Sequence, residues 1–106
     1  MPALSETTSE IRVDIIVYPE AGEWVAHCLQ FDLVCSAPTA EAAREDMKSL
    51  VIAHVQFAFD NGLLAGLWRP APAECWQKLA TARQSEQTTP VQPRNNAPRL
   101  DLFCYA

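Results

Sequence analysis

Hydrophobic and polar positions alternate over residues 11–18, and this period of two, rich in β-branched side chains, predicts a strand. A proline and a glycine in residues 19–22 then predict a turn. Residues 23–29 return to an extended pattern, and residues 33–36 are expected to form a third short strand after a bend. Because the connections are short, the three strands should form an antiparallel meander.

A helix is predicted from Thr39 to Asn61. Thr39 is a suitable N-cap, and Gly62 can take the left-handed conformation that ends helices. Helical spacing predicts a buried stripe made of Ala43, Met47, Leu50, Val51, His54 and Ala58. Three further apolar residues lie near that stripe, namely Ile52, Val55 and Phe59. They indicate a second packing partner, either residues 63–79, which we favour, or another chain.

The second half of the chain is expected to contain a short helix, a linker and a final strand. Pro72 can begin the helix, which extends to Ala82. Residues 84–98 carry three prolines and little apolar content, which predicts a Pro-rich linker. Residues 99–106 alternate again and predict a C-terminal strand that returns to the sheet or is exchanged between subunits. Residues 1–10 are expected to be a flexible tail.

Together these elements predict an α+β domain at residues 11–83. Its order is β-β-β-α-(α)-β in two layers, with a helix on one face of a small, mainly antiparallel sheet. The chain has 106 residues and is 49% hydrophobic, which suits one domain with one core. The first and last strands carry apolar residues on both faces, so we expect a second copy to cover the open face.

The charge of the chain is negative and uneven. Its formal net charge is −5, with −7 in residues 1–60 and +2 in residues 61–106. This balance argues against a nucleic-acid-binding module, which needs a basic surface. The acidic half could attract a basic partner, or it could only keep the surface soluble. We see no secretory signal and no apolar run of membrane-spanning length, so we expect a cytoplasmic protein with reduced thiols.

The chemistry-bearing residues predict neither catalysis nor a metal site nor a cofactor. His27 and Cys28 are neighbours on a strand and should point to opposite faces. His54 is expected in the core, and a Cys35–His54 pair would lack an orienting third group. The four cysteines, Cys28, Cys35, Cys75 and Cys104, form no C-x-x-C pair, and most of them are expected to act as small buried hydrophobes. The chain is therefore predicted not to be an enzyme.

Apolar residues that the predicted core does not absorb are candidates for contact with a partner or a second subunit. These candidates are Trp24, Ile52, Val55, Phe59, Phe103 and Tyr105. They favour a homo-oligomer, a dimer or a tetramer.

Residues 22–62 resemble the HicB-type antitoxin domain. The resemblance rests on Gly22 and Trp24, the run Cys28-Leu29-Gln30-Phe31-Asp32-Leu33, and Thr39 followed by Ala43 at the helix start. It implies a β-β-β-α-β, partial RNase H-like fold with no catalytic activity. In that family the domain binds and blocks HicA, a small basic toxin that cleaves messenger RNA, and a C-terminal segment binds the operator.

The chain departs from the family pattern in two places. Pro38 stands where Gly-Asp usually precedes the helix, and residues 84–106 show no DNA-binding segment. The resemblance therefore implies a stand-alone HicB-like antitoxin that neutralises a small basic HicA-type RNase toxin. The alternative is a homo-oligomeric structural or small-ligand-binding module without a toxin, with the ligand in the crevice between the helix and residues 63–72.

Overall fold

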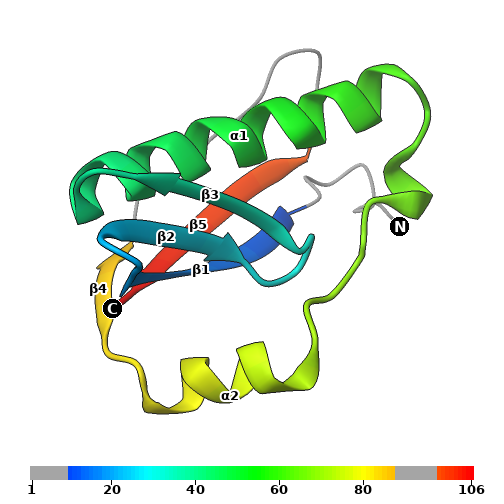
Figure 1. Cartoon of the computed structure of the whole chain (residues 1–106). Helices are drawn as coiled ribbons and strands as arrows, with labels where there is room; N and C mark the ends of the chain where they lie inside the picture. The colour runs from blue at the N-terminus through cyan, green and yellow to red at the C-terminus, as the bar shows by residue number, and fades with distance from the viewer. Residues whose placement is uncertain (1–9, 88–97) are drawn as a thin grey trace.

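Five strands form one mixed sheet in the order β3-β2-β1-β5-β4 in the computed structural model, which describes residues 10–87 and 98–106 (Figure 1). The elements are β1 (Glu10–Glu20), β2 (Glu23–Cys28), β3 (Leu33–Ala37), α1 (Ala40–Asp60), the 3-10 helix η2 (Leu64–Gly66), α2 (Ala73–Thr81), β4 (Gln84–Gln87) and β5 (Arg99–Tyr105). All neighbouring strands are antiparallel except β1 and β5, which run parallel. The predicted α+β class and mainly antiparallel sheet are confirmed.

A two-residue turn joins β1 to β2. Glu20 pairs with Glu23, and the two residues between them, Ala21 and Gly22, have φ angles of 53° and 83°. Positive φ at both central positions gives the turn the twist that matches a hairpin. Glycine adopts this conformation freely, whereas Ala21 does so at a cost of roughly 1–2 kcal/mol.

Local side-chain and backbone bonds set both ends of α1. The Thr39 hydroxyl accepts a hydrogen bond from the Ala42 N–H at 3.1 Å, as the predicted N-cap should. At the other end, the Gly62 N–H donates to the Phe59 carbonyl at 3.2 Å and the Leu63 N–H donates to the Ala58 carbonyl at 2.7 Å. With Gly62 at φ 68°, these two bonds form a Schellman motif, so α1 ends where the sequence predicts.

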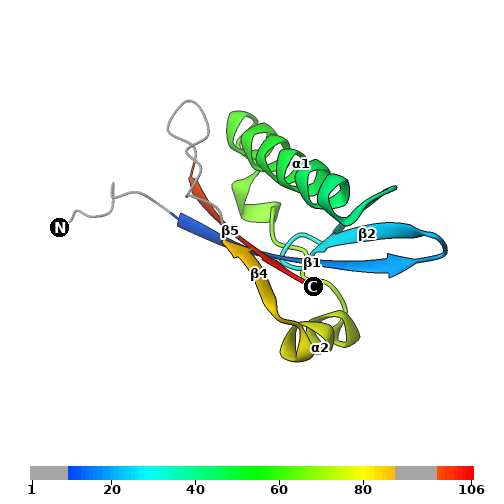
Figure 2. The same cartoon turned by 90° about the vertical axis from the view of Figure 1, so that its left-hand side faces the viewer.

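α1 covers one face of the sheet with a stripe that differs from the predicted one (Figures 1 and 2). Its buried residues are Ala43, Met47, Val51, Val55 and Ala58. Leu50 is 38% exposed and His54 is half-buried, so the prediction that both lie in the buried stripe is wrong. The reason is that the buried positions advance mainly in steps of four, which brings Val55 over the sheet and turns Leu50 outward.

α2 packs against the opposite face of the sheet. The sequence predicted that a second copy of the chain would cover this face. Ile16, Leu29 and Ala71 form a second cluster, with Tyr18 and residues of α2 packed against it. The Trp76 indole N–H donates to the Ala71 carbonyl at 3.0 Å and holds α2 in place. Part of the apolar second face is therefore covered by the chain's own α2, without a second copy.

β5 returns to the sheet of its own chain, between β1 and β4. Its register with β1 runs from Arg99 opposite Glu10 to Tyr105 opposite Ile16. The predicted linker at residues 84–98 is wrong at its start, because residues 84–87 form β4 and pair with β5. An edge strand needs backbone bonds on one side only, so a polar sequence can form one. The rest of that linker, residues 88–97, and the predicted tail before Glu10 lie outside the described residues.

Candidate functional site

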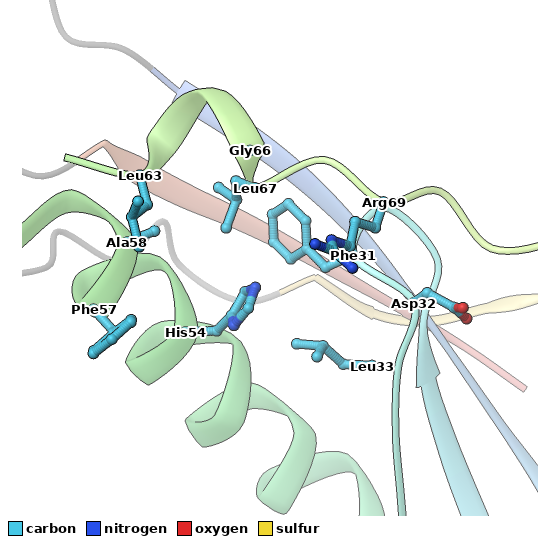
Figure 3. Close-up of a pocket in the computed structure, with 10 residues that line it drawn as sticks. All are labelled: Phe31, Asp32, Leu33, His54, Phe57, Ala58, Leu63, Gly66, Leu67 and Arg69. Carbon is cyan, nitrogen blue, oxygen red and sulfur yellow. The ribbon is translucent and has the colours of Figure 1, made fainter. Parts of the chain in front are cut away.

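A hollow of about 450 Å³ opens between the C-terminal end of α1, the bend after β2 and the segment that follows α1 (Figure 3). We call it the α1 hollow. It is lined by Phe31, Asp32, Leu33, His54, Phe57, Ala58, Leu63, Gly66, Leu67 and Arg69. The crevice expected between the helix and residues 63–72 is present at this place, although the sequence did not identify the residues that line it.

The segment that follows α1 forms one wall of the α1 hollow, and backbone hydrogen bonds hold it against the end of β2. The Arg69 N–H donates to the Gln30 carbonyl at 3.1 Å, and the Ala71 N–H donates to the Leu29 carbonyl at 2.8 Å. Leu67 is buried in the main core, and Leu64 packs against that core. The second packing partner of the helix therefore includes residues that follow it in the same chain, as we favoured.

Three of the ten residues that line the α1 hollow are aromatic, namely Phe31, His54 and Phe57. Phe31 is 3% exposed, and its ring centroid lies 5.6 Å from that of His54 and 5.3 Å from that of Trp68. The interplanar angles of 45° and 53° are those of tilted aromatic pairs. Phe57 and Leu63 are 62% and 51% exposed. Large apolar groups thus remain in contact with solvent around a cavity, as is typical of binding sites.

Two charged side chains, Asp32 and Arg69, line the α1 hollow. Asp32 has a φ angle of 55°, and its Oδ1 is hydrogen-bonded to His27 Nε2 at 2.7 Å. Figure 3 shows its carboxylate directed away from Phe31 and His54. Among the residues that the structure describes, no carboxylate pairs with the Arg69 guanidinium. The sequence signal for this site is Arg69 directly after Trp68 in a loop, and none of the motifs considered above includes this pair.

A second surface lies at the outer edge of β3, beside the turn between β1 and β2. None of the described strands pairs with that edge, and Val34 there is 56% exposed. Glu20 and Glu23 line a shallow groove of about 560 Å³ beside it. The pKa of the Cys35 thiol is raised, mainly by burial and secondly by the negative charge of Asp46. The Asp46 carboxylate, on α1, is therefore also near β3. We call this surface the acidic edge.

The candidate contact residues on the α1 side differ in exposure. Val55 is fully buried in the core, so the prediction that it contacts a partner is wrong. It was misplaced because the buried stripe follows steps of four. Trp24 and Ile52 are partly buried and pack against the main core, and Phe59 is half-buried. These three retain some surface, and their contact with a partner stays a prediction.

The two candidates on β5 are held by polar partners from β1. The Tyr105 ring is 8% exposed, and its hydroxyl donates to Asp14 Oδ1 at 2.9 Å. Arg12 Nη2 donates to the same hydroxyl at 2.9 Å, and its guanidinium lies 3.9 Å from the Phe103 ring centroid. Tyr105 therefore has little surface left for a partner, because it joins β5 to β1 inside the chain.

The structure brings no nucleophile and base together from the residues weighed for chemistry. The Cys35 thiol is directed to the Ala43 carbonyl at 3.7 Å, at the start of α1. His54 lies eleven residues further along α1, which is about 16 Å of helix. Burial raises the pKa of the Cys28 thiol to about 11, which leaves it protonated. Within residues 10–87 and 98–106, no group of His, Cys, Asp and Glu is arranged to hold a metal ion.

The fold and these two surfaces define a small α+β protein with a lined hollow and an uncovered acidic strand edge. No protein-family model, curated protein or solved structure matches the chain. Among the described helices, none has the length and apolar character needed to cross a membrane.

Proposed function

We propose that the chain is a non-enzymatic, HicB-like binding protein that neutralises a small basic HicA-type RNase toxin. The resemblance of residues 22–62 to the HicB-type domain supports this proposal. The resemblance implies three strands, a helix and a further strand, and β1, β2, β3, α1 and β5 occur in that order, with η2, α2 and β4 between α1 and β5. The partial RNase H-like relationship is part of the same proposal.

The observation that carries the proposal is the acidic edge. An unpaired strand edge offers a row of backbone N–H and C=O groups to an extended segment of a partner. Glu20, Glu23 and Asp46 are all exposed around this edge, so the segment that binds best carries lysine or arginine. Val34 lines the same groove as Glu20 and Glu23 and, at 56% exposed, supplies an apolar contact.

This arrangement gives a physical reason for neutralisation. A protein that cleaves messenger RNA binds phosphates with a basic surface. Carboxylates arranged along a strand edge attract the same basic side chains and exclude RNA from them. Inhibition would then need only binding, with no chemical step by this chain.

Co-expression with a HicA-type toxin tests the proposal. We expect the chain to restore growth and to co-purify with the toxin, and a short basic protein should be encoded beside it. The triple variant Glu20→Gln, Glu23→Gln and Asp46→Asn should lose at least about tenfold in affinity, since it removes all three carboxylates of the acidic edge.

A matched control removes the same charge elsewhere with Glu10→Gln, Asp60→Asn and Glu74→Gln. We expect this control to retain binding and rescue. Equal losses in both triple variants would show that net charge, and not the acidic edge, attracts the partner. Failure of the unaltered chain to bind or rescue any HicA-type toxin, with no basic protein encoded nearby, would overturn the proposal.

A further inference from the structure

We propose that the α1 hollow binds a small aromatic carboxylate. This inference is independent of the proposed function, because the α1 hollow and the groove of the acidic edge share no lining residue. Its volume of about 450 Å³ falls within the usual range for small-molecule sites. One or two fused rings fill such a space.

The lining selects an aromatic ligand over an aliphatic one. Phe31 forms the floor and is in ring contact with both His54 and Trp68. Figure 3 shows the His54 ring reaching from α1 toward Phe31, with Phe57 further along the same helix. Phe57 lines the hollow and is 62% exposed, so it can gain burial against an inserted ring. Offset and edge-to-face ring pairs add to that gain.

Arg69 selects the charge and shape of the ligand's polar group. Its guanidinium is permanently charged, and its planar fork matches a carboxylate with two parallel hydrogen bonds. The neighbouring carboxylate of Asp32 is hydrogen-bonded to His27 at 2.7 Å, and in the described part of the chain it forms no ion pair with Arg69. Arg69 is the one lysine or arginine among the lining residues, so a single negative charge fits better than a phosphate dianion.

His54 supplies a second polar contact. Within the described part of the chain, its ring nitrogens have no hydrogen-bond partner, although the side chain is half-buried. A half-buried donor or acceptor gains when a ligand atom satisfies it. His54 and Arg69 both line the hollow, and together they can hold a carboxylate or a ring substituent in one orientation.

Titration with phenylacetate, followed by calorimetry and by backbone amide NMR shifts, tests this proposal. We expect binding at millimolar or lower concentration, with the shifts centred on the lining residues Phe31, His54 and Phe57. Phenylacetamide, which has nearly the same shape but no charge, should bind at least about tenfold more weakly. Arg69→Gln should cause a similar loss and remove the preference for the acid.

Two further variants separate the site from general effects. Arg83→Gln removes the same charge from an exposed position outside the α1 hollow and should bind phenylacetate as the unaltered chain does. Gly66→Leu should block binding without unfolding the chain, because a Cβ at Gly66 meets no atom within 4 Å. Denaturation midpoints verify that each variant folds. Absence of binding, shifts away from the α1 hollow, or full affinity in Arg69→Gln would overturn the proposal.

Discussion

Replacing Tyr105 with phenylalanine removes one hydroxyl group from the pairing of β1 with β5 and leaves the ring in place. That hydroxyl donates to Asp14 Oδ1 at 2.9 Å and accepts from Arg12 Nη2 at 2.9 Å. The Asp14 side chain is 6% exposed, whereas the Arg12 side chain is 58% exposed. The bond to the buried carboxylate therefore matters most, because water screens the bond from Arg12.

We expect Tyr105→Phe to lower the free energy of unfolding by about 2 kcal/mol. A hydrogen bond to a charged group contributes about 1.5–3 kcal/mol, and Asp14 keeps other partners in the variant. Those partners are Arg12 and the Gln30 side-chain amide, whose nitrogen donates to Asp14 Oδ2 at 2.7 Å. For a chain of this size, the loss corresponds to a fall of about 10 °C in Tm.

The stability difference should also depend on pH. Burial, followed by the hydrogen bond to Asp14, raises the pKa of Tyr105 above its ordinary value of 10.0. Tyr105 therefore stabilises the fold fully below the pKa that it has in the unfolded chain, about 10, and this contribution is lost as pH rises through the higher folded value. Phenylalanine does not titrate, so the gap between the two proteins should narrow above pH 10 or so.

Urea denaturation at several pH values measures both effects, as a shift of the midpoint at constant slope. Tyr18→Phe is the matched control, because no hydrogen bond to the Tyr18 hydroxyl is present among the described residues. It should change stability by less than about 0.5 kcal/mol. An equally small change in Tyr105→Phe, or a gap that does not narrow at high pH, would refute the assigned role of this hydroxyl.

Three further outcomes are expected. Thr39→Ala should cost about 1 kcal/mol in thermal or urea denaturation, because the Ala42 N–H loses its partner, while Thr39→Ser should retain most of the stability; equal losses would contradict the N-cap role. Cys28 and Cys104 should react with an aromatic disulfide reagent only on unfolding, since both are fully buried and the pKa of Cys28 is about 11; rapid reaction of either in the native protein would contradict their burial. Light scattering should give the mass of a dimer or a larger assembly at micromolar concentration, as the predicted homo-oligomer requires, and a monomer mass would remove that prediction.

The sequence predicted the two proposed binding surfaces to different extents. The charge of residues 1–60 indicated a basic partner, but only the strand order shows that β3 is an edge with Glu20 and Glu23 beside it. The crevice after the helix was expected from the apolar character of the following segment. The aromatic floor at Phe31 was not expected, because Phe31 lies in a bend 23 positions before His54 in the sequence.

The sequence by itself determined the elements whose causes are local. The β1–β2 turn follows from the conformational freedom of Gly22, and both ends of α1 follow from Thr39 and Gly62. These signals act between residues a few positions apart, so they are visible in the chain before it folds.

Tertiary structure alone decided which apolar positions became buried and which stayed free. Val55 became core and Leu50 became surface, because the sheet selects the face of α1 that it contacts. α2 covered part of the second face, and a polar segment became β4 because β5 offered it a free edge. Each outcome depends on a partner distant in sequence, and a pattern along the chain does not specify which distant partner a surface will meet.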